Sequence, residues 1–387
     1  MSTPPSLPPP SHSAPFLTPP PFQVANFADV FTGRLLSEIP QALSALLTSL
    51  LTLPHLYTVN LSDNAFGLNT QAPLVDFLSQ HVPLRHLILN NNGLGPAAGV
   101  LIADALTTLA AKKAAARASG TASVPDLETI ICGRNRLENG SMAAWAKTFA
   151  AHTGIKEVKM VQNGIRAEGI THVLSHGFAH SRAIEVLDLQ DNTFTATGAR
   201  ALANVVANWA AIRELGVGDC LLSGRGGIAL ADALAKGNNA KLQVLRLEFN
   251  DINAKGVAGL AAALGKLPAL RRVELEGNKF DAEDPAIETL REELGKRREG
   301  AGVEDEDDEN WGVGDLDELE SEDEDEEDDD EEAKAGSDEE DQGVAAQEKA
   351  ARDIIADQQA EEEVVAQKND KEVDDLADAL AKTEIKK

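Results

Sequence analysis

Short runs in which apolar and polar residues alternate recur along most of the chain, and each is followed by a longer stretch with helical spacing. Residues 84–94 show the pattern, because Leu84, Leu87 and Leu89 are followed by Asn92 and then by Leu94. Apolar positions with a period of two predict a short strand with one buried face, and the asparagine predicts a turn. The stretches that follow, such as 198–209 and 256–267, carry apolar residues at i, i+3, i+4 and i+7. That spacing predicts amphipathic helices.

The strand and turn pattern can be written LxxLxLxxNxL, and it occurs eight times. Its turn position holds Asn64, Asn92, Asn135, Asn163, Asn192, Cys220, Asn250 and Asn278, at spacings of 28, 43, 28, 29, 28, 30 and 28 residues. A degenerate ninth unit precedes these, with Phe22, Ala25 and Phe27 in its strand. This length and pattern indicate leucine-rich repeats. Because a unit buries its apolar face only against its neighbours, we predict an α/β solenoid: a horseshoe of strand–helix units of about 28 residues, with the strands on the concave side.

The one long spacing contains an insertion, LAAKKAAARASGTASVP at 109–125. We expect this segment to protrude from the solenoid. Its basic residues Lys112, Lys113 and Arg117 are candidates for contacting an acidic surface of a partner. The alternative is a solvated helix extension and loop without a binding role.

Acidic residues are concentrated at the C-terminus. Residues 1–303 carry 27 acidic and 27 basic side chains, whereas residues 304–387 carry 37 acidic and 8 basic ones, so this last part provides the formal charge of −29. Such a segment cannot bury a core, and we expect it to be disordered. We therefore divide the chain into a proline-rich disordered N-terminus (1–21), the repeat domain (22–300), an acidic disordered tail (301–343) and a charged, partly helical segment (344–387). The tail disfavours nucleic acid as a ligand and favours a basic protein partner.

Neither a membrane span nor a secretory signal is evident in the sequence. No apolar run approaches the roughly 18 residues of a span, and the proline-rich N-terminus lacks the basic start and apolar core of a signal peptide. The two cysteines, Cys132 and Cys220, fall at repeat positions and cannot form a disulfide framework. We expect a soluble intracellular monomer that binds neither membranes nor nucleic acid.

Motifs for metal binding or catalysis are weak. His172, His176 and His180 are spaced four residues apart, which would align them on a helix. Zinc needs a further ligand or an open catalytic position, and no HExxH pattern accompanies these histidines, so we expect no metal site. We also find no nucleophile with a base and an orienting acid, and no nucleotide-binding fingerprint. The sequence therefore indicates a binding surface rather than an enzyme with its own pocket.

Two residues at the edge where strands become loops are candidates for contacting a partner. Asn92 occupies the turn position and is structural, whereas Asn91 lies just outside it, where nothing in the repeat demands an amide. Arg34 follows a glycine in the loop after the first strand; its alternative role is a surface pair with Glu38. Because strands two units apart are separated by roughly 10 Å, Arg34 and Asn91 could serve one partner. The positions equivalent to Asn91 hold Asp63, Arg134, Gln162, Asp191, Asp219, Phe249 and Gly277, and we count Asp63, Asp191 and Asp219 among the candidate partner contacts.

From about Phe22 onward, the chain resembles the GTPase-activating proteins of the small GTPase Ran, in their fungal form. The resemblance is carried by FADVFTGRLLSEIP, TVNLSDNAFG, LNNNGLGP, TIICGRNRLENGSM, VKMVQNGIR, EVLDLQDNTFT and GDCLLSGRG, followed by the acidic run. These stretches are more specific than a generic leucine-rich repeat, which would match only at the apolar and turn positions.

The resemblance implies a function and roles for two residues. In the family, the arginine of the FTGR motif, here Arg34, is required for activation without entering the active site as a finger. The asparagine of the NNGLG motif, here Asn91, contacts the GTPase's own catalytic glutamine. The implied partner is GTP-bound Ran, with a Ran-binding protein as a further member of the complex. GTP and Mg²⁺ would be held by the GTPase, and no cofactor of this chain is implied. The implied location is the cytoplasm, including the perinuclear region.

Other interpretations stay open. Family members begin with a capping unit and a full first repeat, so either the proline-rich stretch caps the array by another route or the usual start is missing. A leucine-rich repeat scaffold or inhibitor would share the repeat length, but it gives no reason for the acidic tail. An acidic histone-binding chaperone would explain the tail, but it would have shorter and fewer repeats. Neither alternative includes GTPase activation.

Overall fold

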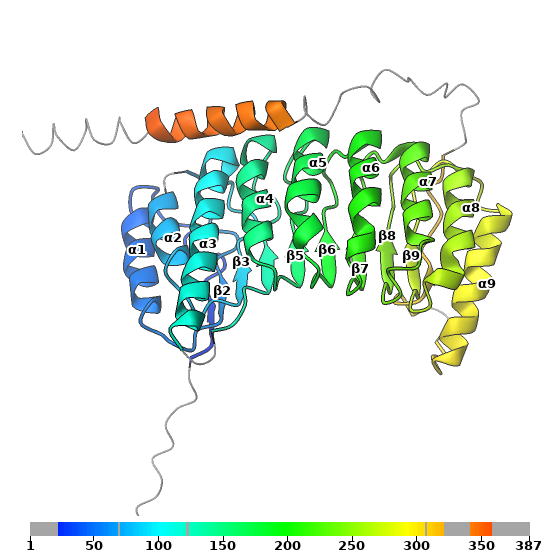
Figure 1. The fold of residues 1–387 in the computed structure, drawn as a ribbon, viewed down its shortest axis with the longest axis horizontal. Helices are drawn as coiled ribbons and strands as arrows, with labels where there is room; N and C mark the ends of the chain where they lie inside the picture. The colour runs from blue at the N-terminus through cyan, green and yellow to red at the C-terminus, as the bar shows by residue number, and fades with distance from the viewer. Residues whose placement is uncertain (1–21, 69, 121–123, 306–307, 321–340, 358–387) are drawn as a thin grey trace, which may run out of the picture.

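The computed structural model describes residues 22–68, 70–120, 124–305, 308–320 and 341–357. Strands and helices alternate along the described chain (Figure 1). The strands are β1 (Val24–Asn26), β2 (Thr58–Asn60), β3 (His86–Ile88), β4 (Thr129–Ile131), β5 (Glu157–Lys159), β6 (Val186–Asp188), β7 (Glu214–Gly216), β8 (Val244–Arg246), β9 (Arg272–Glu274) and β10 (Gly312–Val313). The α-helices are α1 (Ile39–Leu50), α2 (Gln71–Leu78), α3 (Gly95–Ala118), α4 (Met142–Ala151), α5 (Ala167–His176), α6 (Thr195–Val205), α7 (Ser223–Leu234), α8 (Ala254–Ala263) and α9 (Pro285–Gly300). Short 3₁₀ helices are η1 (Asn139–Ser141), η2 (Phe178–His180), η3 (Val206–Asn208) and η4 (Leu264–Lys266).

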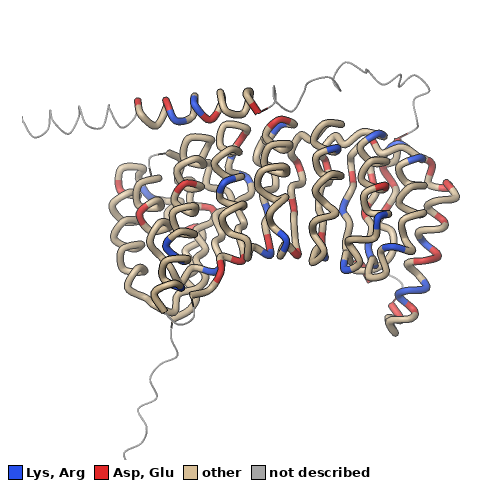
Figure 2. Tube along the Cα trace, in the orientation of Figure 1, with Lys and Arg blue, Asp and Glu red and all other residues tan. Residues whose placement is uncertain are grey.

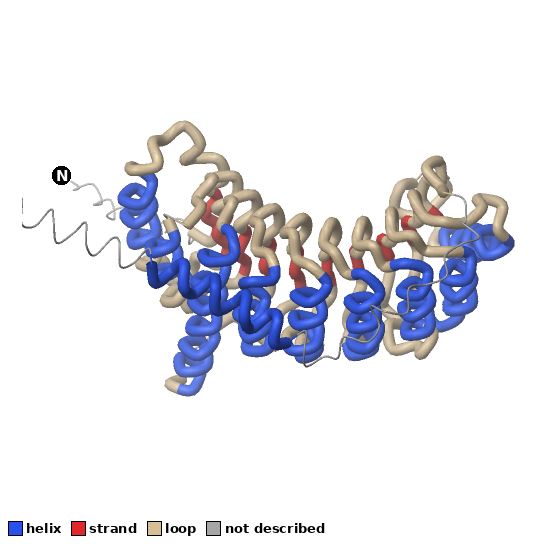
Figure 3. Tube along the Cα trace, turned by 90° about the horizontal axis from the view of Figure 1, so that it is seen from above, coloured by secondary structure: helices blue, strands red, loops and turns tan. Residues whose placement is uncertain are grey.

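The described strands form one parallel sheet in the order of the chain, from β1 to β10. The central residue of each early strand is buried, and the register places Ala25 beside Val59, Val59 beside Leu87, and Leu87 beside Ile130. Parallel neighbours need a crossover, which the intervening helix supplies. Figure 3 shows the strands along the inner side of the curve and the helices along the outer side. The predicted α/β horseshoe, including its degenerate first strand, is confirmed.

The turn asparagines form a hydrogen-bonded ladder through the array. The side-chain oxygen of Asn92 accepts from the backbone N–H of Asn64 at 3.0 Å, and Asn92 in turn donates its backbone N–H to Asn135 Oδ1 at 2.9 Å. Cys220 takes this position in its own unit, where it is buried and its N–H donates to Asn250 Oδ1. Burial raises the pKa of the Cys220 thiol to about 12, and that of Cys132 likewise. Both cysteines are therefore neutral packing residues.

The array extends beyond the predicted boundary at residue 300. Strand β10 pairs with β9, placing Val313 beside Val273, and the Arg271 guanidinium lies 5.9 Å from the ring centroid of Trp311. Leu316 and Leu319 pack against the core. Part of the segment predicted as disordered tail therefore covers the last repeat. The sequence pattern missed this strand because it is only two residues long and lies among acidic residues.

A further helix, over residues 341–357, lies across the outer helices and is drawn in orange above α3 and α4 in Figure 1. Val344, Ala351 and Ile355 are its buried apolar residues. Arg352 pairs with Asp104 of α3, with 2.9 Å between Nη1 and Oδ2. The helix begins three residues before the predicted C-terminal segment and is docked on the array. The predicted N-terminus 1–21 and the part of the predicted C-terminal segment from residue 358 onward lie outside the described residues.

At the other end, β1 is the edge strand of the described sheet, and its first residue, Val24, is exposed, as is Phe22 just before it. Among the described residues, no helix is long and apolar enough to cross a membrane.

Candidate partner-binding rim

The loops that lead from each strand to the next helix form one edge of the array, which we call the rim. It is defined by the residue before each of the eight ladder positions and by the equivalent Asp29 of the degenerate first unit: Asp29, Asp63, Asn91, Arg134, Gln162, Asp191, Asp219, Phe249 and Gly277. All have φ between 50° and 65°. This left-handed region is costly for most side chains but tolerated by Gly, Asn and Asp. Asn91 suits this backbone, but Arg134 and Phe249 adopt it as well, so the repeat does not demand an amide at residue 91.

The three consecutive asparagines have three different partners. Asn90 Oδ1 accepts from the backbone N–H of Gly133 at 2.7 Å, and Asn92 belongs to the ladder. Asn91 is exposed and donates from Nδ2 to Oδ1 of Asp63, in the preceding unit, at 3.0 Å. A carboxylate only accepts hydrogen bonds, so this contact fixes which end of the Asn91 amide faces Asp63. Within the described residues nothing donates to Asn91 Oδ1, so this oxygen can still accept a hydrogen bond.

The loop that carries Arg34 is anchored to the same place. Phe31 is buried against Phe66, with ring centroids 5.9 Å apart. The hydroxyl of Thr32 contacts the Asp29 carboxylate and lies 3.1 Å from the backbone oxygen of Asp63. The Arg34 side chain is exposed and forms no ion pair with Glu38 in the part of the chain that the structure describes. The alternative role predicted for Arg34, a pair with Glu38, is therefore not observed.

Asp63 connects the two predicted functional residues. Its side chain holds the Asn91 amide, and its backbone oxygen receives Thr32 from the Arg34 loop. The structure thus places the loop that carries Arg34 beside Asp63 and Asn91 at one end of the rim. The sequence placed Asp63 on this surface but did not reveal that it orients Asn91 or that Thr32 ties the loop to it. The sequence feature that could have indicated this role is the acidic residue at the rim position one repeat before Asn91.

Asp191 and Asp219 lie on the same rim, three and four strands away from Asn91. Burial raises the pKa of Asp191, and the neighbouring Asp219 carboxylate raises it further. At about 4.8 Å per strand, they are roughly 14 to 19 Å from Asn91 along the array. Their roles as partner contacts stay predictions.

The basic residues of the insertion are not near this surface. Helix α3 starts at the rim and continues through the insertion, so Lys113 lies about 27 Å along the helix from its start. Lys113 is buried, and its Nζ donates to the backbone oxygens of Val82, Leu84 and Pro125 at 2.7, 2.6 and 2.8 Å. Arg117 pairs with Asp126, and only Lys112 is both exposed and without such an anchor. The prediction that Lys113 contacts a partner is wrong, because its ammonium holds the helix extension against the array.

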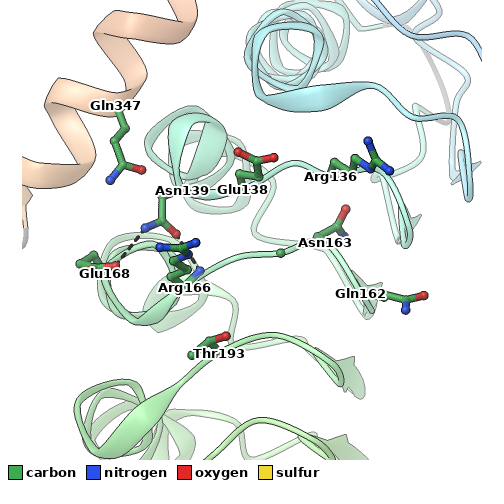
Figure 4. Close-up of a pocket in the computed structure, with 10 residues that line it drawn as sticks. Arg136, Glu138, Asn139, Gln162, Asn163, Arg166, Glu168, Thr193 and Gln347 are labelled. Atoms are coloured by element: carbon green, nitrogen blue, oxygen red, sulfur yellow. Dashed lines mark hydrogen bonds between the residues drawn. The ribbon is translucent and has the colours of Figure 1, made fainter.

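A polar hollow of about 490 Å³ opens beside the rim between the units of β4 and β6 (Figure 4). Asn139 links its walls by donating to Glu168 Oε2 at 3.0 Å and accepting from the backbone N–H of Arg166 at 2.8 Å. Gln347, from the helix over 341–357, borders the hollow on one side. The remaining lining residues are Arg136, Glu138, Gln162, Asn163, Gly164 and Thr193. Opposite charges are mixed here, so the hollow has no single electrostatic preference.

Charges on the concave face pair with one another. Glu128 contacts both Arg85 and Lys156, at 2.9 and 3.2 Å, and Arg246 lies between Glu214 and Glu274. Figure 2 shows basic and acidic residues interspersed along the whole array. Such pairs contribute little stability, but they leave fewer unpaired charges for a partner on this face. The rim around Asn91 and Arg34 is the better candidate for the functional surface.

Comparisons with known proteins agree with the repeat architecture. A family model described as Leucine Rich repeat matches residues 180–203 and 238–261. The chain is 42% identical over 270 residues to Ran GTPase-activating protein 1 of Saccharomyces cerevisiae, covering 68% of this chain and 65% of the relative. It is 33% identical over 268 residues to the Ran GTPase-activating protein of Drosophila melanogaster, covering 68% and 44%. A ribonuclease inhibitor of Sus scrofa is 29% identical over 201 residues, covering 52% and 41%. The matched region thus spans just under two thirds of the yeast relative and under half of the fly one. In sequence and repeat architecture, the chain is similar to Ran GTPase-activating proteins.

Proposed function

We propose that this protein activates GTP hydrolysis by the small GTPase Ran, and that it does so by holding the GTPase's own catalytic glutamine. The observation that carries the proposal is the exposed Asn91 amide, whose Nδ2 is fixed by Asp63 at 3.0 Å beside the loop of Arg34. The identity to Ran GTPase-activating proteins supports the choice of partner.

The proposed mechanism follows from the chemistry of phosphoryl transfer. Attack of water on the γ-phosphate of GTP, which yields GDP and phosphate, requires a glutamine that orients the water. Asn91 Oδ1 would accept a hydrogen bond from the glutamine's amide nitrogen, leaving the glutamine's oxygen to accept from the water. Asn91 is neutral, so it positions the glutamine without adding charge. GTP and Mg²⁺ would be bound by Ran, and this chain would contribute no cofactor.

Arg34 has a different proposed role. It lies on a loop anchored by Phe31 and Thr32, next to the Asn91 site rather than within it. We assign it to shaping the interface with the GTPase or its switch region. The same proposal includes the GTP-bound form of Ran as the partner, a Ran-binding protein as a further component, a monomeric activator and a cytoplasmic, including perinuclear, location.

A single-turnover assay of phosphate release from GTP-loaded Ran tests the proposal. Catalytic amounts of the protein are expected to raise the rate about 10³-fold or more. Asn91→Gly removes the amide and suits the left-handed backbone, whereas Asn91→Ala also removes it but strains that backbone. Both variants, and Arg34→Ala, are expected to lose most of the stimulation, while Lys112→Ala keeps it. Wild-type activity in Asn91→Gly would overturn the assigned role.

A scaffold or inhibitor is the second candidate, favoured by the similarity to a ribonuclease inhibitor. It predicts stoichiometric binding of a partner without any change in the rate of GTP hydrolysis. The same assay therefore separates the two candidates.

A further inference from the structure

Two histidines and a carboxylate that are distant in sequence meet on the outer side of the array. His172 and His176 lie one turn apart on α5, with stacked rings whose centroids are 4.4 Å apart. Asp341 is the first residue of the helix over 341–357, 169 residues from His172. Its Oδ1 lies 2.7 Å from His172 Nδ1, and its Oδ2 lies 3.7 Å from His176 Nε2. His180 is in η2, because α5 ends at His176, and it is not part of this cluster.

We propose that His172, His176 and Asp341 form a Zn²⁺ site that fastens the C-terminal helix to the repeat array. The three ligand atoms lie within 4.8 Å of one another. Tetrahedral zinc with bonds of about 2.0 to 2.2 Å places its ligands roughly 3.3 to 3.6 Å apart. The two Asp341 distances, 2.7 and 3.7 Å, are slightly shorter and slightly longer than this separation. Small side-chain rotations would therefore bring the ligand atoms to the spacing that zinc requires. Two imidazoles and one carboxylate, with a water in the fourth position, are a common zinc ligand set.

The surroundings of His176 favour this role. Its Nδ1 lies 3.3 Å from the backbone oxygen of His172 and can donate to it. That hydrogen bond selects the tautomer in which Nε2 carries a lone pair, and Nε2 is the atom that faces Asp341. Metal-bound histidines usually donate their other ring nitrogen to a carbonyl or carboxylate in this way. His176 and Asp341 are about half exposed, so an ion can reach the site from solvent.

The zinc site would stabilise the docking of the helix over 341–357, which has few other contacts with the array. Only Val344, Ala351 and Ile355 are buried on the helix, supplemented by pairs such as Arg352 with Asp104. Zinc binding requires Asp341 to be beside α5, so it stabilises the docked helix by linkage.

The test measures Zn²⁺ binding to the full chain, without a polyhistidine tag, in competition with a chromogenic chelator. The wild-type protein is expected to bind one ion, and His172→Ala, His176→Ala and Asp341→Ala each to weaken binding at least tenfold. His180→Ala is the matched control and should bind as the wild type does. Hydrogen exchange of residues 344–357 provides the second readout, which should slow with Zn²⁺ in the wild type and not in Asp341→Ala.

Several results would overturn the proposal. One is the absence of stoichiometric Zn²⁺ binding. Another is unchanged affinity in Asp341→Ala, which would reduce the site to a histidine pair on α5. A third is exchange of residues 344–357 that does not respond to the ion. None of these outcomes depends on GTPase activation, since neither measurement includes Ran.

Discussion

The amide of Asn91 donates from Nδ2 to Oδ1 of Asp63 across 3.0 Å, which joins two neighbouring repeats at the rim. Both residues are exposed and both have a left-handed backbone, with φ of 53° and 61°. Asp63 therefore orients the oxygen of Asn91 without covering it. In the proposed mechanism it is a positioning residue, because it acts on the GTPase only through Asn91.

Asp63→Ala is expected to lower the maximal rate of GTP hydrolysis at saturating activator by about 10- to 100-fold, because a misplaced orienting group loses much of its effect. Asp63→Asn should recover most of the rate, since its amide oxygen still accepts from Asn91. The two variants are compared by titrating each into single-turnover reactions with GTP-loaded Ran. Equal activity of Asp63→Ala and the wild type would show that the hydrogen bond does not matter.

Thr32→Val is expected to weaken activation several-fold through the Arg34 loop. The change keeps the shape of the side chain but removes the hydroxyl that contacts Asp29 and Asp63. Thr52→Val is the control, because the Thr52 hydroxyl also bonds to a backbone oxygen, that of Ser49, but lies after α1 and away from the rim. If both variants changed the rate equally, the loop anchor would not be the cause.

Lys113→Met is expected to lower the free energy of unfolding by about 2 to 4 kcal/mol, because it leaves buried backbone oxygens without a donor. The neighbouring Lys112→Met should change it by less than about 0.5 kcal/mol, since Lys112 is exposed. Burial lowers the pKa of Lys113 to about 8, so its ammonium is retained at neutral pH. Urea denaturation of the two variants gives the comparison, and similar losses would contradict the anchoring role.

His152 makes the array sensitive to acid. Burial lowers its pKa to about 4, although its hydrogen bond to the backbone oxygen of Leu106 acts in the opposite direction. In the unfolded chain its pKa is about 6.5, so between these values the unfolded state binds a proton that the folded state does not. Stability therefore falls as pH drops from about 6.5 to 4, by about 3 kcal/mol from this residue.

His152→Gln should reduce that pH dependence, since the amide can still donate to Leu106 but does not titrate. The free energy of unfolding is measured by urea titration at pH 7, 5.5 and 4.5. Some dependence should persist, because burial also lowers the pKa of His81. Parallel curves for the variant and the wild type would exclude His152 as the cause.

The sequence by itself determined the solenoid, because its buried positions repeat at a fixed spacing and each unit needs only its neighbours to complete its core. The strand at Leu87, the ladder at Asn92 and the packing role of Cys220 all follow from that local rule. The rim position of Asn91 also followed, since a side chain next to the turn in one repeat has the same place in every other.

The tertiary structure alone decided contacts that the repeat rule does not encode. The helical pattern around Lys113 predicts an exposed side chain, but the structure buries its ammonium against three backbone carbonyls from other segments. The short β10 is formed by pairing with β9 rather than by its own pattern. His172 and His176 lacked a third ligand in the sequence, and Asp341 comes beside them only when the C-terminal helix docks. Such contacts join residues far apart in the chain, where spacing carries no information about which side chains meet.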